Sequence, residues 1–287
     1  MTAIYKRELK SYMTSMIGYL FIFFVLLLTG IYFSAYQLTY GYPKFEYTLS
    51  AVTFVFIIGV PILTMRVLAE ERKQKTDQLL LTSPVSVGGI VIGKYLALVT
   101  VFAIAIGIMA FYPLLMSKFG TVSYAEAYTA LFGFFLLGCA NLAVGVFLSA
   151  LTESQVIAAV LGFIVLFAFY MMSGISTFFS QTSLSTCMTF ACLIVAAAMI
   201  IYTMIKNVFI SVVVGVIGEI ALFVIYVIKS SLFEGGIQKI LEAFNLSGHF
   251  ENFTNGMFDV TGIVYFLSVI AICIFLTMQT IQKRRWN

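Results

Sequence analysis

Residues 154–205 read SQVIAAVLGFIVLFAFYMMSGISTFFSQTSLSTCMTFACLIVAAAMIIYTMI, a run of 52 residues without one charged side chain. A transmembrane helix needs about 20 predominantly apolar residues, so this run is too long for one crossing and long enough for two. The Ser- and Thr-rich stretch Ser176–Thr186 is the natural break between them. Because a segment in lipid must satisfy its own backbone hydrogen bonds, we expect an all-α integral membrane protein.

The composition of the whole chain points the same way. Of the 287 residues, 62% are apolar and 10% are charged, whereas soluble domains are about 45–50% apolar and about 25% charged. A chain with so few charges cannot cover a globular surface with polar groups. The composition therefore excludes a soluble enzyme, a disordered tail and a nucleic-acid-binding module.

Stretches with little or no charge predict about eight transmembrane helices in one membrane domain over residues 1–287. We expect them at residues 17–38, 48–65, 90–116 and 127–150, as two helices within 154–205, and at 208–228 and 260–281.

The basic residues predict the orientation, since Lys and Arg favour cytoplasmic loops. With both termini in the cytoplasm, the outer side keeps only Lys44, Lys118, Lys229 and Lys239 of the 16 basic residues. The cytoplasmic side then holds Lys6, Arg7, Lys10, Arg66, Arg72, Lys73, Lys75, Lys94, Lys206, Lys283, Arg284 and Arg285. We expect a multi-pass protein of a bacterial cell membrane.

Residues 1–16 have an amphipathic pattern. Apolar and aromatic side chains recur at helical spacing, with basic residues and Ser11 on the other face. Such a segment lies in the membrane interface as a helix; the alternative is an ordinary basic flank of the first span. Ile4, Tyr5, Leu9, Tyr12 and Met13 form the apolar face.

Residues 69–89 are the longest cytoplasmic connection and carry the densest charge. Glu70 and Glu71 suit the start of a helix, where acidic side chains complement the helix dipole. Leu79, Leu80 and Leu81 follow, before Pro84. A solvated loop does not require three consecutive leucines, whereas a helix that docks into another protein would use them. We therefore favour a docking helix.

Residues 88–94, GGIVIGK, satisfy the spacing of a phosphate-binding loop, but Tyr95 stands where that loop needs Ser or Thr. The segment opens an apolar span, so its glycines are expected to allow close packing and Lys94 to reach the interface with its long side chain. No nucleotide, other cofactor or metal site is expected in this chain, and no enzymatic activity of its own.

Glu219 is the one carboxylate inside a predicted span, where an ionisable group is costly and marks a candidate functional site. It either lines a transport pathway or gate, or is a hydrogen-bonded packing residue. Residues 229–257 form the longest outer segment, with an amphipathic helix predicted around Ile237–Phe244. His249 follows it and is expected to be structural.

Three motifs resemble permeases of the type-2 family of ATP-binding-cassette (ABC) transporters, most closely the branch of gliding-motility permeases. The first is YKRELKSYMTSMIGYLF at residues 5–21, in which Met13 and Met16 replace an aromatic residue and a proline of the family pattern. The second is the run Glu70-Glu71-Arg72, Thr76-Asp77-Gln78-Leu79-Leu80, Ser83-Pro84-Val85 and Gly93-Lys94, with Lys75 where glycine is usual and Asp77 in place of Glu. The third is His249-Phe250, Gly256, Asp259, Tyr265-Phe266 and Arg284-Arg285-Trp286.

The resemblance implies the membrane subunit of an ATP-driven exporter. Residues 1–16 would be its elbow helix (Tyr5, Arg7, Glu8, Leu9 and Tyr12), and the 69–89 segment would be its coupling helix (Glu70, Glu71, Arg72, Lys73, Thr76, Asp77, Leu79 and Leu80). The core would have six spans, so the predicted eight include an extra hairpin around 187–228.

The expected partners are a separate ABC ATPase that holds ATP and magnesium, a second permease chain (a second copy or a sister permease), an accessory extracytoplasmic protein and membrane lipids, with no nucleic acid. The main alternative is a secondary transporter or channel that needs no ATPase. An intramembrane protease with paired glutamates is disfavoured, because Lys75 replaces its arginine and the single His249 cannot supply its histidines.

Overall fold

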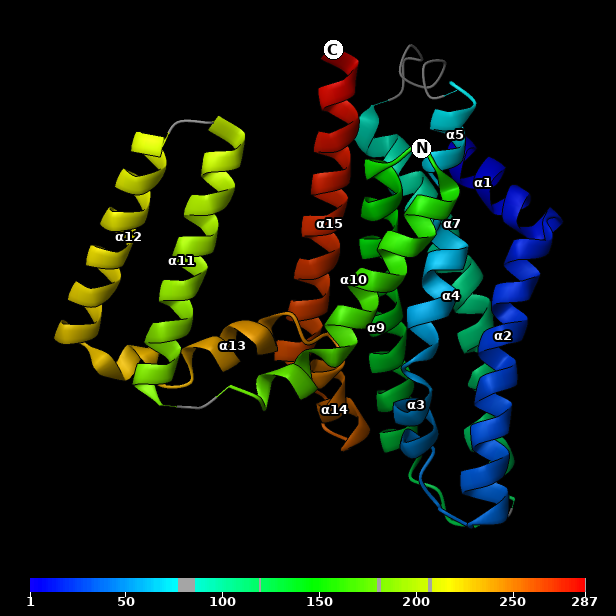
Figure 1. Cartoon of the computed structure of the whole chain (residues 1–287). Helices are drawn as coiled ribbons and strands as arrows, with labels where there is room; N and C mark the ends of the chain where they lie inside the picture. Colours follow the sequence, from blue (N-terminus) through cyan, green and yellow to red (C-terminus); the bar gives the residue numbers. More distant parts are fainter. Residues whose placement is uncertain (77–85, 119, 180–181, 206–207, 287) are drawn as a thin grey trace. The chain divides into compact units, whose positions relative to one another are not determined.

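The computed structural model describes residues 1–76, 86–118, 120–179, 182–205 and 208–286, and all regular structure in these residues is helical (Figure 1). The expectation of an all-α membrane protein is confirmed. The chain forms two compact units, Met1–Tyr170 with Leu246–Asn287, and Met171–Asn245.

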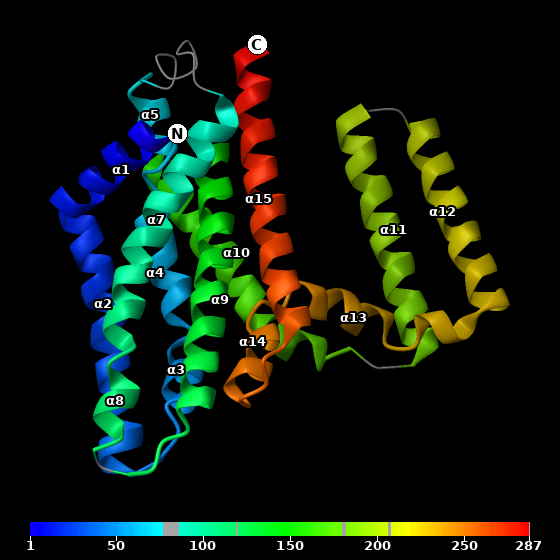
Figure 2. The same ribbon diagram turned by 180° about the vertical axis from the view of Figure 1, so that it is seen from behind.

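The first unit is a helical bundle around α9 (Tyr124–Leu151), whose side chains are mostly buried. Helices α1 and α5 lie at one end of this bundle and α3 and α8 at the other (Figures 1 and 2). Its elements are α1 (Thr2–Thr14), α2 (Met16–Phe33), the π-helix η1 (Ser34–Thr39), α3 (Glu46–Val52), α4 (Val55–Thr64), α5 (Ala69–Lys73), α7 (Val87–Met109), α8 (Tyr112–Met116), α9, α10 (Gln155–Ser176), α14 (Gly248–Thr254) and α15 (Val260–Trp286), with the last residues of α10 counted in the second unit.

Phenylalanine rings fill the centre of this bundle. Phe102 of α7 is fully buried and contacts Phe56, Phe134 and Phe135, with ring centroids 5.7–6.3 Å apart. Gly138 of α9 lies directly beneath that ring. Helices α4, α7 and α9 are therefore closely packed. Membrane helices depend on such packing, because lipid supplies no hydrophobic driving force for their association.

The predicted spans agree with the structure to different degrees. Five described helices are long and apolar enough to cross a membrane: Met16–Thr39, Val87–Met116, Tyr124–Leu151, Gln155–Ser176 and Val260–Lys283. Each begins and ends within a few residues of a predicted span.

The second predicted span, residues 48–65, is bent in the structure. Glu46–Val52 and the following Val55–Lys73 meet at an angle of 59°, so the two count as one broken span or as none. Hydropathy does not show this bend, because it reports how apolar a segment is and not the direction of its axis.

The second unit contains the two remaining predicted spans as helices α11 (Ser183–Ile205) and α12 (Val208–Ile228). They pack against each other where a Cβ at Gly218 would lie 2.9 Å from Ile194 Cγ2. Their apolar segments within the described residues, Ser183–Ala196 and Gly215–Ile228, are shorter than a span. The count of eight is therefore not confirmed; the described helices give five, or six with the bent pair.

The segment at 229–257 is divided between the two units. In the second unit, the 3-10 helix η2 (Ser230–Phe233) precedes α13 (Gly236–Ala243). Ile237 of α13 is buried, and the side-chain amide of Gln238 donates to the carbonyl of Phe179 at 2.9 Å. In the first unit, His249 of α14 stacks on Tyr265 of α15 with ring centroids 3.8 Å apart. A packing contact of this kind fits the structural role expected for His249.

Candidate functional site

The N-terminal helix α1 packs along the start of α7. Ser15 has extended backbone and separates α1 from α2, which lets the chain change direction before it enters the first span. Tyr5 and Thr100 share a hydrogen bond of 3.0 Å between their hydroxyls. A Cβ at Gly93 would lie 3.3 Å from the Met1 carbonyl oxygen, so this glycine allows the close packing that the sequence predicts.

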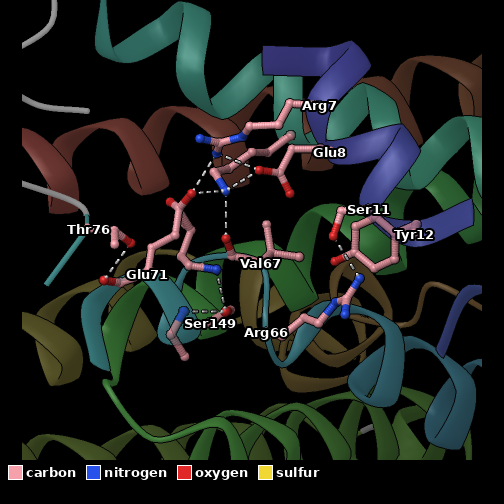
Figure 3. Close-up of polar contacts among 12 residues, drawn as sticks. Arg7, Glu8, Ser11, Tyr12, Arg66, Val67, Glu71, Thr76 and Ser149 are labelled. Atoms are coloured by element: carbon pink, nitrogen blue, oxygen red, sulfur yellow. Dashed lines mark hydrogen bonds and ion pairs between the residues drawn. The ribbon is translucent and has the colours of Figure 1, made fainter. Parts of the chain in front are cut away.

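Tyr12 fixes the other side of α1. Its ring is buried and its hydroxyl donates to the Leu63 carbonyl at 3.2 Å. The guanidinium of Arg66 lies over the ring, 4.4 Å from its centroid, and donates to Ser11 Oγ at 3.4 Å (Figure 3). It also donates to Ser15 Oγ at 3.1 Å. The cation–π contact and these hydrogen bonds join α1 to the end of α4.

Lys94 of α7 is the centre of the candidate site. Its side chain is 2% exposed, and its ammonium contacts Glu8 Oε1 at 3.0 Å and Glu71 Oε1 at 2.9 Å. It also donates to the Val67 carbonyl at 2.9 Å. Three N–H donors therefore meet three oxygens, from α1, α5 and the connection between α4 and α5.

Arg7 closes the ring of charges. Its guanidinium contacts Glu8 Oε1 at 2.7 Å and Glu71 Oε1 at 2.8 Å (Figure 3). We call Arg7, Glu8, Glu71 and Lys94 the charged cluster. Two cations and two anions balance, and this matters most for the buried Lys94, because an unpaired charge there would be strongly destabilising.

The charged cluster favours the ionised form of Glu8. Burial alone would raise the pKa of this carboxyl, but the Lys94 ammonium and the Arg7 guanidinium outweigh burial and hold the pKa below its usual value. The side chain is 13% exposed. Glu8 is therefore a carboxylate that binds α1 to α7 at neutral pH.

A single hydroxyl satisfies the backbone where α4 gives way to α5. The buried Ser149 Oγ of α9 accepts from the amides of Leu68 and Ala69 at 3.2 and 3.3 Å, and lies 3.3 Å from the Met65 carbonyl as donor. Buried backbone groups need such partners. The junction of the two helices is thereby attached to the central helix of the bundle.

The sequence-predicted coupling residues lie partly within the described residues. α5 contains Glu70, Glu71, Arg72 and Lys73; Arg72 is buried and donates to the Thr152 carbonyl at 3.4 Å, whereas Lys73 is exposed. Thr76 Oγ1 donates to the Glu71 carbonyl at 3.3 Å. Asp77, Leu79 and Leu80 lie outside the described residues.

Lys75 adopts the backbone conformation that favours glycine, with φ of +56°. The permease family that the sequence resembles usually has glycine at this position. The structure gives the physical reason: a residue with a side chain costs about 1–2 kcal/mol in the left-handed region. The chain tolerates lysine there at the end of the short α5.

Of the predicted elbow residues, Arg7 and Glu8 belong to the charged cluster, Tyr5 and Tyr12 make the contacts above, and Leu9 packs half-buried against the core. The sequence did not predict the ion pairs of Lys94, whose side chain is buried against Glu8 and Glu71. The Gly93-Lys94 pair in the resembling motif was the signal that marked this residue.

Glu219 lies in the second unit, on α12. It lines an open groove of about 660 Å³ between α11 and α12, together with Tyr202 and with exposed apolar side chains that include Met199, Val212 and Ile220. Among the described residues, Glu219 Oε1 has no hydrogen-bond partner. The structure thus places a carboxyl among mostly apolar side chains at an open groove.

The sequence of this chain matches a known family of membrane proteins. The family model described as ABC-2 family transporter protein matches residues 3–215, well over half of the chain, from α1 into α12. No match was found among curated proteins. The gliding-motility branch stays a prediction. With its membrane-spanning apolar helices and a family match over most of its length, the chain belongs to the ABC-2 transporter family of membrane permeases.

Proposed function

We propose that this permease is the membrane subunit of an ATP-driven exporter and that the charged cluster couples it to a separate ATPase. Family membership supports a membrane permease of an ABC transporter with an ABC ATPase partner. The observation that carries the proposal is Glu71: it lies on the segment predicted to dock into the ATPase and contacts both α1, through Arg7, and α7, through Lys94.

In this proposal, ATP binding closes the ATPase dimer and displaces the 69–89 segment. Glu71 then pulls on Lys94 and Arg7, so that α7 and α1 move with α5. Because these ion pairs lie in a poorly hydrated place, they transmit force better than solvated pairs, which are weak and exchange readily. The permease pair shifts between inward- and outward-facing arrangements, or releases a lipid-like cargo sideways.

The assembly follows from the same proposal. Both termini and the 69–89 segment lie on the cytoplasmic side, where the basic residues favour them. The partners are an ABC ATPase that holds ATP and magnesium, a second permease chain as a second copy or a sister permease, membrane lipids and an accessory extracytoplasmic protein. The host membrane is a bacterial cell membrane.

Glu71→Lys is expected to uncouple the complex. It would place three cations around one carboxylate, and like charges at this distance repel strongly in a poorly hydrated site. We expect at least about a tenfold loss of the ATPase stimulation by the permease, with the variant still inserted in the membrane. The measurement is ATP hydrolysis by the reconstituted complex relative to the isolated ATPase subunit.

Glu251→Lys is the matched control, because it makes the same charge change at an exposed position of α14. Full stimulation by Glu71→Lys would contradict the coupling role. If no ATPase chain co-purifies in mild detergent and a proton gradient alone drives transport, the alternative of a secondary transporter or channel holds instead.

We also propose that Glu219 belongs to a transport pathway or gate. A carboxyl among apolar side chains in a membrane helix costs free energy, and such residues commonly mark transport or proton pathways. Dicyclohexylcarbodiimide, an apolar reagent for carboxyl groups, should label Glu219 at rates that differ several-fold between the nucleotide-free and the vanadate-trapped complex, as located by peptide mass spectrometry. Glu219→Gln serves as the unlabelled control. Equal labelling rates in both states would assign Glu219 to packing.

A further inference from the structure

Tyrosine side chains surround a pocket at the end of the first unit opposite the charged cluster. The pocket has a volume of about 610 Å³, within the range of small-ligand sites. We call it the tyrosine pocket and define it by Tyr36, Tyr42, Lys44 and Tyr47, which line it together with Ser50. Tyr42 is central, with its ring centroid 6.2 Å from that of Tyr36 and 5.8 Å from that of Tyr47.

The backbone around the tyrosine pocket is held in place by one buried amide. Gln37 of η1 donates to the Lys44 carbonyl at 2.9 Å and accepts from the Thr48 hydroxyl at 2.7 Å. Gly41, with φ of +68°, makes the turn that brings Tyr42 back beside η1. π-helical turns such as η1 occur frequently at functional sites. The rings are therefore positioned by a built framework and not by a free loop.

The charges at the tyrosine pocket suit a ligand with two opposite charges. Faces of tyrosine rings attract cations, and about 6 Å or less from the ring centroid is the effective range. Lys44 supplies a cation of its own, and its pairing with Glu126 is long, 3.5 Å, between side chains that are 48% and 39% exposed. Such a pair contributes little, so Lys44 can exchange Glu126 for the anion of a ligand.

The depth of the tyrosine pocket indicates where the ligand comes from. The first candidate span ends at Thr39, and Tyr42 and Lys44 follow it directly. Residues at the end of a span lie at the level of the lipid headgroups. A lipid headgroup is therefore within reach of the tyrosine pocket.

We propose that the tyrosine pocket binds the headgroup of an amine-containing phospholipid such as phosphatidylethanolamine, with its ammonium against the rings of Tyr36, Tyr42 and Tyr47 and its phosphate beside Lys44. The proposal does not depend on coupling to an ATPase. Such a site differs from the ordinary belt of aromatic residues at a membrane interface, which has no preference for one lipid headgroup.

The same end of the bundle offers a matched control for that belt. Tyr124 and Tyr128 at the start of α9 stack on each other, with ring centroids 6.4 Å apart, and neither lines the tyrosine pocket. Both are exposed to about the same extent as Tyr42. Tyr124→Leu therefore removes an interfacial ring without touching the proposed site.

The test is native mass spectrometry of the full chain in detergent with phosphatidylethanolamine or phosphatidylglycerol. We expect the wild type to bind the former about fivefold more tightly, Tyr42→Leu and Lys44→Gln each to weaken that binding about fivefold, and Tyr42→Phe and Tyr124→Leu to leave it unchanged. Thermal unfolding checks that each variant is folded.

Three results would overturn the proposal. Equal affinity for the two lipids would remove the role of the ammonium. Equal losses in Tyr42→Leu and Tyr124→Leu would leave only an interfacial belt. Soluble glycerophosphoethanolamine that competes with the lipid at equal concentration would show that the pocket binds a free headgroup compound and not a membrane lipid.

Discussion

Lys94→Met is expected to destabilise the protein by about 3 kcal/mol, because it leaves the largely buried carboxylates of Glu8 and Glu71 with the exposed guanidinium of Arg7 as their remaining partner. Lys94 contacts both at 2.9–3.0 Å and is 2% exposed, and Arg7, more than half exposed, cannot replace it. The expected result is a lower midpoint of thermal unfolding in detergent, measured by the loss of helical circular dichroism or by aggregation.

Two further variants separate this effect from a general loss of charge. Lys118→Met removes an exposed lysine at the other end of the bundle and should leave the midpoint unchanged. Lys94→Met combined with Glu8→Gln should recover part of the lost stability. One of the two carboxylates that lost the ammonium is then replaced by a neutral amide. A midpoint for Lys94→Met equal to that of the wild type would mean that the charged cluster does not hold α1 and α5 to α7.

Gly138→Leu is expected to destabilise the bundle by about 3 kcal/mol or more. A Cβ at position 138 would overlap the ring of Phe102. This ring is confined by Phe56, Phe134 and Phe135 and is fully buried, so it cannot move aside. The yield of folded protein and the midpoint of thermal unfolding should both fall.

Gly107→Leu, in α7, is the control for the same change of side chain. A Cβ at position 107 meets no atom within 4 Å, and leucine has the higher helix propensity. The midpoint should therefore stay the same or rise. If Gly138→Leu unfolds at the same temperature as Gly107→Leu, the close packing of α7 on α9 is not needed for stability.

Hydropathy and charge predicted the elements that depend on each segment by itself. Five spans, the separate helix at residues 2–14 and the short amphipathic helix at Gly236–Ala243 all follow from the solvent that each side chain prefers. The bend between α3 and α4 does not, since it depends on neighbours that hydropathy ignores.

The charged cluster was predicted only in pieces. Arg7, Glu8 and Glu71 were candidates for two separate roles, and Lys94 was expected at the interface, because a sequence gives no sign that residues 86 positions apart form an ion pair. A buried lysine looks in the sequence like any lysine at a span end. The burial of Lys94 can be predicted only once Glu8 and Glu71 are known to lie beside it.

Ser149 has a consequence for how the bundle can move. Its buried hydroxyl is the acceptor for the amides of both Leu68 and Ala69. If α5 swung out alone, both donors would lose their partner, at about 1–3 kcal/mol each. These two bonds attach the junction to α9 and favour a joint movement of α5 and α9 over an outward swing of α5 alone. A force applied at residues 69–76 then tilts the central helix instead of bending a loop.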